Sequence, residues 1–278
     1  MQKKWGCDKL ELSTTDGGIF TAMIIKRDVL FTPVQKTRTL HIYLPDGYDE
    51  SDQQYPVMYF FDGHNLFDDA EATYGKCWGI KDFLDQWDMP IIIVGIECSH
   101  EGNERLREYC PYHFQGGIFG DLYGIGDETL RWIVEKLKPM IDKEYRTYYF
   151  REATGIGGSS MGGLMSLYAA VKYNRYFSKA ACLSSSISLC MKEFKRDIAQ
   201  SDLDPDTKVY LSWGTRESKD AEDDDEDLKS NAARNNLAIA SRLKEKDVQT
   251  KVYCQRGGHH CEADWEKQVP YFMEYLWK

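Results

Sequence analysis

Two kinds of hydrophobic pattern follow one another along this chain. Residues 56–61 (PVMYFF) and 90–96 (PIIIVGI) are continuous apolar runs, a pattern typical of strands covered on both faces of a parallel sheet. Residues 19–25 and 39–44 carry β-branched and apolar residues between turn sequences rich in Asp, Gly and Pro, which predicts two more strands. A short helix is expected over residues 80–87.

The second half of the chain continues this alternation. A helix over residues 128–145, capped by Asp127 and kinked at Pro139, is predicted from apolar residues at helical spacing: Leu130, Ile133, Val134, Leu137 and Ile141. Further helices are expected over residues 161–173, 231–246 (with Leu237, Ala240 and Leu243 facing inward) and 263–277, and further strands up to Gly157 and over residues 180–184, 208–213 and 250–254. This order predicts one α/β domain over residues 1–278, with a mostly parallel sheet and helices on both faces.

The composition narrows the class of protein. Hydrophobic residues make up 42% of the 278 positions, enough for a sizeable core. The net charge of −10 argues against nucleic acid as a partner, because phosphate binding needs clustered Lys and Arg. We expect no membrane partner and a cytoplasmic location, since no apolar run approaches the roughly 18 residues of a membrane span and no signal-peptide pattern is visible.

Cysteines and acidic residues do not suggest a metal site. The eight cysteines are scattered without CxxC spacing, so neither a thiolate zinc site nor a disulfide framework is expected. The acidic residues 221–228 (AEDDDEDL) lack the glycine and the alternating spacing of a calcium-binding loop. We interpret them as a solvated loop that leads into a helix.

A glycine-rich stretch with two serines, GIGGSSMGGL at residues 155–164, carries the first chemical signal. The G-x-S-x-G pattern of a nucleophile elbow fits Ser160, which has glycines at 158 and 162, and does not fit Ser159, because residue 161 is methionine. A phosphate-binding loop is less favoured, since the stretch lacks the P-loop lysine. Glycine is needed two positions either side because a Cβ there would collide with neighbouring backbone.

The nucleophile needs a base that is oriented by a carboxylate. With the chain order Ser, acid, His, only His259 and His260 follow Ser160, and spacing does not choose between them. Glu217 comes just after the predicted strand 208–213 and is the first candidate for the acid; Asp220 and then Glu222 are the alternatives.

An oxyanion hole needs two backbone donors. The helix that begins behind Ser160 offers the amide of Met161. The loop after the apolar strand 56–61 reads Asp62-Gly63-His64-Asn65, and we expect the second donor to be the His64 amide.

Several longer segments extend these motifs over most of the chain. They include RTLHIYLPDGYDESDQQYPVMYFFDGHNLF, GSSMGGLMSLYAAVKYNRYFSKAACLSSS, YLSWGTRES and HCEADWEKQ. From about residue 37 to 277 the chain resembles the putative esterase (esterase D-like) family of α/β-hydrolases, which includes feruloyl and acetyl xylan esterases of carbohydrate esterase family 1, enterochelin esterases, S-formylglutathione hydrolases and mycolyltransferases. The resemblance implies an α/β-hydrolase fold without a large cap domain and a serine esterase.

The resemblance also implies site residues. Relatives carry a segment like H-N-E-x-x-W whose first residue is catalytic, and matching Glu262 and Trp265 selects His260; the G-T-x-E segment likewise favours Glu217. The chain departs from the family at His64, where many relatives carry Gln, and at Cys261, where Asn or Asp is common. No metal or cofactor is implied.

The expected substrate is a small-molecule or oligosaccharide ester with a short acyl group, such as acetyl or feruloyl. The candidate substrate-binding residues are Trp78, Tyr109 and Trp213 for stacking, with Arg105, Arg107 and Arg216 as cations for an anionic siderophore ester. A siderophore esterase and an acyltransferase with the same triad are the alternatives, and a non-catalytic binding protein is disfavoured by the intact Ser, His and Glu set.

Overall fold

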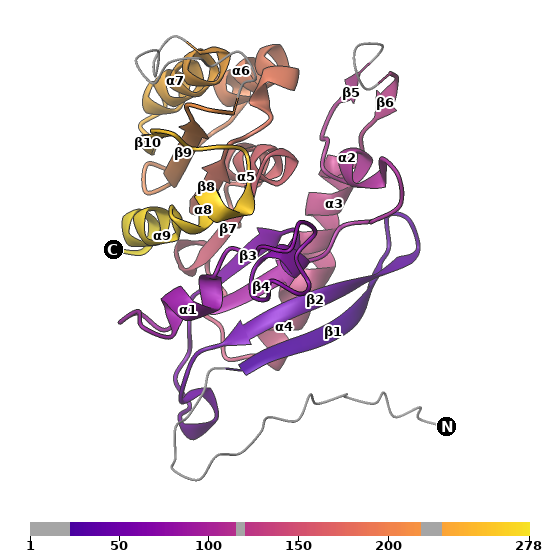
Figure 1. Ribbon diagram of the computed structural model, residues 1–278, viewed down its shortest axis with the longest axis vertical. Helices are drawn as coiled ribbons and strands as arrows, with labels where there is room; N and C mark the ends of the chain where they lie inside the picture. Colours follow the sequence, from indigo (N-terminus) through magenta and orange to yellow (C-terminus); the bar gives the residue numbers. More distant parts are fainter. Residues whose placement is uncertain (1–22, 115–119, 218–229) are drawn as a thin grey trace.

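An eight-stranded sheet organises the protein, with strand order β1-β2-β4-β3-β7-β8-β9-β10 (Figure 1). The computed structural model describes residues 23–114, 120–217 and 230–278. The strands are β1 (Met23–Phe31), β2 (Lys36–Leu44), β3 (Val57–Phe61), β4 (Ile92–Ile96), β7 (Thr154–Ser159), β8 (Lys179–Leu183), β9 (Lys208–Gly214) and β10 (Gln249–Gln255). β2 pairs antiparallel with β1 and β4, whereas the pairs from β4 to β10 are parallel.

The central strand β3 divides the core into two halves because its side chains alternate between the faces of the sheet. Val57, Tyr59 and Phe61 belong to one buried cluster, and Met58 and Phe60 belong to the other. Both faces of this continuous apolar run are therefore covered, as its sequence predicts.

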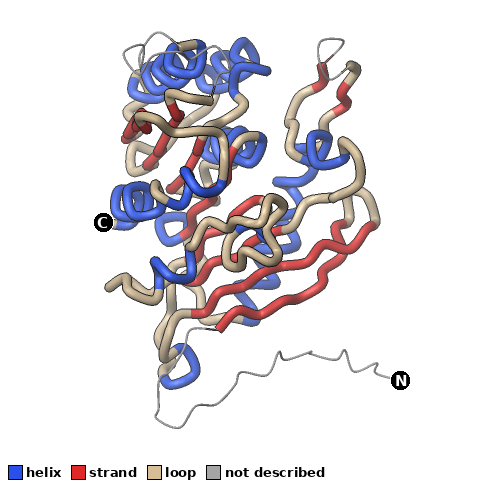
Figure 2. The backbone as a smooth tube through the Cα atoms, viewed as in Figure 1, coloured by secondary structure: helices blue, strands red, loops and turns tan. Residues whose placement is uncertain are grey.

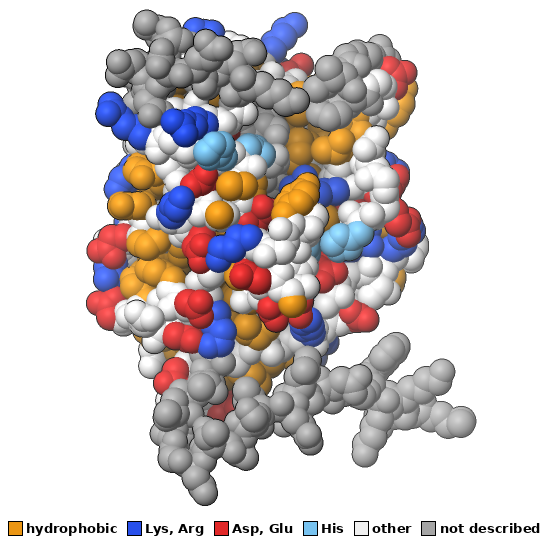
Figure 3. All heavy atoms as spheres, in the orientation of Figure 1, with side chains coloured by type: hydrophobic (Ala, Val, Ile, Leu, Met, Phe, Trp, Pro, Cys, Tyr) orange, Lys and Arg blue, Asp and Glu red, His pale blue; other side chains and the backbone are white. Residues whose placement is uncertain are grey.

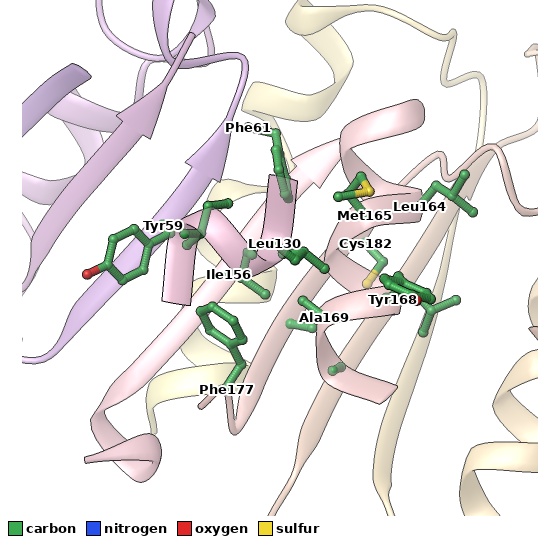
Figure 4. Packing of buried hydrophobic residues seen from close by; sticks show 14 of the residues in the cluster. Tyr59, Phe61, Leu130, Ile156, Leu164, Met165, Tyr168, Ala169, Phe177 and Cys182 are labelled. Carbon is green, nitrogen blue, oxygen red and sulfur yellow. The ribbon is translucent and has the colours of Figure 1, made fainter. Parts of the chain in front are cut away.

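Helices cover both faces (Figures 1 and 2). Buried residues of α3 (Gly126–Trp132), α4 (Lys138–Glu144), α5 (Met161–Lys172), α6 (Met191–Gln200) and α7 (Asn231–Lys244) join the Tyr59 cluster, and Figure 4 shows Leu130, Leu164 and Met165 packed there with Ile156 and Cys182. Residues of α1 (Ile80–Leu84), α8 (Glu262–Glu266) and α9 (Val269–Trp277) join the Phe60 cluster. The expected fold class, a mostly parallel sheet between two helical layers, is confirmed.

Shorter elements complete the fold. These are α2 (Glu104–Glu108), the two-stranded ribbon of β5 (His113–Phe114) and β6 (Leu122–Tyr123), and the 3-10 turns η1 (Tyr48–Glu50), η2 (Gly63–Asn65), η4 (Arg151–Ala153) and η5 (Ile187–Leu189). Among the described residues, no helix is both long and apolar enough to cross a membrane. The predicted strand at residues 19–25 is described only from Met23 onward, and the acidic residues 221–228 lie outside the described ranges.

The predicted helix over residues 128–145 is three segments. α3 begins at Gly126 without a side-chain cap, so the prediction of an Asp127 cap is wrong; that carboxylate instead accepts a hydrogen bond from Tyr173 at 2.8 Å. A π-helical turn, η3 (Ile133–Leu137), comes before α4, whose first turn contains Pro139. The π-helical turn lies where the missing N–H of Pro139 and the clash of its ring with the carbonyl four residues earlier would disturb a regular α-helix.

Two other helices differ from their predictions. In α7, Ala240 and Leu243 are buried but Leu237 is 37% exposed, so its predicted inward orientation is wrong. The C-terminal helix predicted over residues 263–277 is divided into α8 and α9, and Pro270 in the first turn of α9 occupies a position where no intrahelical donor is needed.

The two leucines of α7 provide a matched test of this core. Leu243 is 1% exposed and Leu237 is 37% exposed, so Leu243→Ala should lower the free energy of unfolding by about 2–5 kcal/mol. Leu237→Ala should change it by only about 0.5 kcal/mol. Urea unfolding followed by circular dichroism measures both, and equal effects would contradict the orientation of α7.

Candidate active site

Ser160 lies in a sharp turn between β7 and α5. Its backbone has φ 56° and ψ −119°, a conformation that non-glycine residues seldom adopt and that costs of order 1–3 kcal/mol. β7 ends at Ser159 and α5 begins at Met161, so the turn holds Ser160 alone at the helix N-terminus. This is the strand-turn-helix geometry that the G-x-S-x-G spacing predicts.

The glycines of the motif permit close backbone packing. A Cβ on Gly158 would lie 2.8 Å from the carbonyl carbon of Gly162, and one on Gly162 would lie 3.0 Å from the Cβ of Phe61. The predicted collision with backbone therefore applies at Gly158, whereas a side chain at Gly162 would be crowded by the Phe61 side chain and not by backbone. The second contact also places the end of β3 beside the beginning of α5.

Hydrogen bonds fix the strained turn. The Ser160 amide donates to the Leu183 carbonyl at 3.0 Å, and the Ser186 amide donates to the Ser160 carbonyl at 3.0 Å. The Ser160 hydroxyl, half-buried, lies 3.4 Å from the Ser186 hydroxyl. The segment after β8 therefore fixes the turn from one side.

The two adjacent histidines have different carboxylate partners. His260 Nδ1 lies 3.4 Å from Glu217 Oε2, whereas the His259 amide donates to Asp264 Oδ2 at 2.7 Å and its Nδ1 lies 3.3 Å from the same oxygen. The structure thus brings His260 and Glu217 together. Among the described residues, Ser160 Oγ has Ser186 and not His260 within hydrogen-bonding distance. The other candidate acids, Asp220 and Glu222, lie outside the described ranges.

Glu217 is held by two donors that orient its second oxygen. Glu217 Oε1 accepts hydrogen bonds from the Gly214 amide and from the Ser184 hydroxyl, both at 2.6 Å. The Ser184 hydroxyl in turn accepts one from Trp265 Nε1 at 2.8 Å. The Trp265 ring also meets the His260 ring edge-on, with centroids 5.1 Å apart. Oε2 is left to face the imidazole.

The sequence reasoning missed Ser184. It is the first of three consecutive serines after β8, and the sequence alone does not show which of the three contacts Glu217. Its φ of 46° is visible only in the structure. In the sequence, Trp265 served only to align the histidine segment with the family motif. Its contacts with Ser184 and His260 give it a physical role in orienting Glu217 and His260.

The loops that carry the acid and the base are joined to each other. The Arg216 amide donates to the Gly258 carbonyl at 2.9 Å, and the Gly257 amide donates to Thr215 Oγ1 at 2.8 Å. A Cβ on Gly214 would overlap the Gly258 backbone. These contacts fix the distance between the two loops and therefore between Glu217 and His260.

The loop that carries the predicted oxyanion donor follows β3. Asp62 has φ 59° and precedes the turn η2 (Gly63–Asn65). Its carboxylate accepts hydrogen bonds from Arg105 Nε and Nη2 at 2.8 and 2.7 Å. Burial alone would raise the pKa of Asp62, but the Arg105 guanidinium holds it below its usual value. A Cβ on Gly63 would lie 2.5 Å from the Gly95 backbone, so the loop is packed tightly against β4.

Most of the candidate substrate-binding residues are buried in the protein interior. Trp78 is buried against Trp265 and Phe272, Trp213 is buried in β9, and Tyr109 is buried with its hydroxyl accepting a hydrogen bond from the Asp62 amide at 3.1 Å. These rings offer little surface to a ligand. The Arg105 guanidinium donates two hydrogen bonds to the Asp62 carboxylate and so binds the loop after β3.

The side chain of His64 is also buried. Its Nε2 lies 2.8 Å from Thr73 Oγ1, and burial lowers its pKa although the nearby Asp62 charge opposes this. Its contacts are with Thr73 and His100, so only its backbone amide stays a candidate for the oxyanion hole.

Comparison with known proteins supplies the family. The family model described as Putative esterase matches residues 32–272. The uncharacterized protein YbbA of Bacillus subtilis (strain 168) is 26% identical over 247 residues, which cover 86% of this chain and 92% of that protein.

Solved structures show the same fold. An IroE-like serine hydrolase from Shewanella oneidensis superposes with a TM-score of 0.70 at 22% identity, covering 91% of this chain and 79% of that one. The siderophore hydrolase EstA from Aspergillus nidulans gives 0.67 at 17% identity, covering 96% and 99%. A ferulic acid esterase gives 0.66 at 15% identity, covering 92% and 98%. At these identities the likeness establishes the α/β-hydrolase fold.

The Ser184 hydrogen bonds can be tested through stability. Ser184→Ala leaves the buried Trp265 Nε1 without its acceptor and should lower the free energy of unfolding by about 1–3 kcal/mol. The control is Ser212→Ala, because the buried Ser212 hydroxyl has no hydrogen-bond partner among the described residues; its removal should be neutral or slightly stabilising. Chemical denaturation measures both, and equal losses would contradict the role of Ser184.

Proposed function

Because this chain belongs to the putative esterase family and is a carboxylic-ester hydrolase, we propose that Ser160, His260 and Glu217 form its catalytic triad. The observation that carries this proposal is the 3.4 Å approach of His260 Nδ1 to Glu217 Oε2 at the sheet edge where Ser160 occupies the strained turn. The paired carboxylate distinguishes His260 from His259, whose partner is Asp264.

In the acylation step, Ser160 Oγ attacks the ester carbonyl while His260 Nε2 takes its proton. Glu217 accepts the Nδ1–H hydrogen bond, which fixes the tautomer with a lone pair on Nε2 and stabilises the imidazolium that forms. The tetrahedral intermediate collapses, the imidazolium protonates the leaving alcohol, and an acyl-serine remains.

The backbone amides of Met161 and His64 are the proposed oxyanion donors. Met161 is the first residue of α5, where the helix leaves its N–H groups without intrahelical partners and its dipole favours negative charge. The contact of Gly162 with Phe61 places the β3 loop beside this helix end. Each donor is worth about 2.7–4 kcal/mol of barrier when it behaves as a typical oxyanion donor.

Water then completes the reaction. His260 takes a proton from water, the hydroxide attacks the acyl carbon, and the proton returns to Ser160 as the acid leaves. The steps need only the side chains and amides named. The proposal requires Ser160 Oγ and His260 Nε2 to come within hydrogen-bonding distance in the substrate complex, in keeping with catalytic hydrogen bonds that are commonly longer in free enzymes.

The proposed substrate is an ester of a short acyl group, such as acetyl or feruloyl, on a bulky alcohol such as a sugar. The support is an open site: the His260 side chain is 40% exposed, and the segment between β8 and β9 holds η5 and the single helix α6 rather than a cap of several helices. A bulky alcohol can therefore remain partly in solvent while its acyl group reaches Ser160.

The triad predicts a sharp difference between neighbouring residues. Ser160→Ala and His260→Ala should each lower kcat for p-nitrophenyl acetate by about 10⁴-fold or more. His259→Ala should change kcat less than about threefold, because its carboxylate partner is Asp264 and not Glu217. Stopped assays on purified variants check this, with circular dichroism as the folding control. Wild-type turnover by Ser160→Ala would overturn the proposal.

The substrate class is tested by a panel of three esters. Acetylated xylo-oligosaccharide or methyl ferulate should be hydrolysed with kcat/KM at least about tenfold above that for enterobactin, because the guanidinium of Arg105 is already bound by Asp62 and contributes little to binding an anionic siderophore. A preference for enterobactin would assign a siderophore esterase instead. Ester transfer exceeding hydrolysis with excess alcohol would assign an acyltransferase.

A further inference from the structure

The side chain of His64, in the turn η2, belongs to a cluster of side chains that the proposed reaction does not use. His64, Glu97 and His100, here called the His-Glu-His cluster, each offer one ligand atom, and these atoms all lie within 4.8 Å of one another. The His64 and His100 ring centroids are 4.6 Å apart. His100 is 58% exposed at its side chain, and Figure 3 shows histidine side chains at the surface in separate places on this face.

His64 supplies the observation that points to a ligand. The residue is 6% exposed, and its Nδ1 is buried without a hydrogen-bond partner among the described residues. Its other ring nitrogen, Nε2, faces Thr73 Oγ1 at 2.8 Å. When Nε2–H donates to that hydroxyl, Nδ1 carries the lone pair and is the ring nitrogen free to bind a metal, as in a metal-binding histidine whose other nitrogen is hydrogen-bonded.

Glu97 is oriented in the same manner. Its Oε1 lies 2.7 Å from Nε2 of the buried His41, and its Oε2 lies 3.7 Å from His100 Nε2. A metal-binding carboxylate is typically held by such a hydrogen bond from a second side chain. The approach of His41 therefore leaves Glu97 Oε2 for the interior of the cluster.

We propose that His64 Nδ1, Glu97 Oε2 and His100 bind one divalent transition-metal cation of the zinc type. Two imidazoles and one carboxylate form a donor set that suits zinc, cobalt, nickel or copper, whereas calcium and magnesium prefer sets of oxygen ligands. Bonds of about 2.0–2.2 Å to a tetrahedral ion place ligand atoms roughly 3.3–3.6 Å apart. The exposed His100 side chain can rotate to shorten the present separations, which are up to 4.8 Å, to these values.

The cation would act on the oxyanion loop and not on the acyl carbon. His64 belongs to η2, and its amide is a proposed oxyanion donor, while Glu97 directly follows β4. A metal bound by both side chains would tether the loop to the sheet. This role is separate from the Ser160 chemistry, so metal binding can be tested without an activity assay.

The test is zinc binding by the full chain after treatment with a chelator. Isothermal titration with Zn²⁺ at pH 7.5 should show one site of micromolar or tighter affinity. His100→Gln and Glu97→Gln should each weaken it by at least about tenfold, and the Co²⁺ derivative should show the intense visible absorption of a tetrahedral site only when these ligands are present. His100 is on the surface, so its variant should fold normally, as circular dichroism will verify.

Two control variants locate the site. His113→Gln alters an exposed histidine in β5 outside the cluster, and His259→Ala alters the histidine paired with Asp264; both should bind Zn²⁺ as wild type does. The proposal is overturned when the wild-type chain binds no Zn²⁺ in this range, when His100→Gln binds it equally well, or when His259→Ala removes the binding.

Discussion

The strained backbone of Ser160 is the constraint around which this site is built. A residue with φ 56° and ψ −119° is disfavoured by of order 1–3 kcal/mol and persists only when its surroundings hold it. Hydrogen bonds to Leu183 and Ser186 hold it from β8, and the absence of side chains at Gly158 and Gly162 lets strand and helix approach. A Cβ at Gly158 would lie 2.8 Å from the Gly162 backbone, so a side chain there would force the strand and the helix apart at Ser160.

Parallel pairing explains why the remaining site residues lie near Ser160. Strands β3, β7, β8, β9 and β10 run parallel, so their carboxyl ends lie along one edge, where ligands bind in open α/β sheets. Five residues follow these strands in turn: Asp62, Ser160, Ser184, Glu217 and His260. Each strand thus supplies one component, and contacts between neighbouring loops, such as Arg216 with Gly258, fix their spacing.

Local patterns predicted what depends on local physics. The G-x-S-x-G spacing selected Ser160 because its steric requirement is contained in five residues, and continuous apolar runs predicted β3 and β4 because two-sided burial leaves no polar positions. Tertiary contacts decided the rest. Asp127 fits a helix cap by sequence, but its carboxylate accepts a hydrogen bond from Tyr173, which directly follows α5. Leu237 fits the inward stripe of α7 by sequence, but it is 37% exposed. Spacing does not choose between the adjacent histidines, because the partner of His260, Glu217, follows β9 far along the chain, whereas His259 contacts Asp264 of α8.

The loop after β3 is fixed through side chains and packing that leave its amides for substrate. Arg105 binds the Asp62 carboxylate with two hydrogen bonds, and Gly63 packs on the backbone of Gly95. His64 Nδ1 is buried without a hydrogen-bond partner among the described residues. Leaving a buried polar nitrogen without a partner costs about 1–3 kcal/mol of stability. A cation bound to His64 Nδ1 would offset this cost. The proposed metal would add to the anchoring by Arg105 and Gly95, and it would act at the second residue after Asp62, whose φ is 59°.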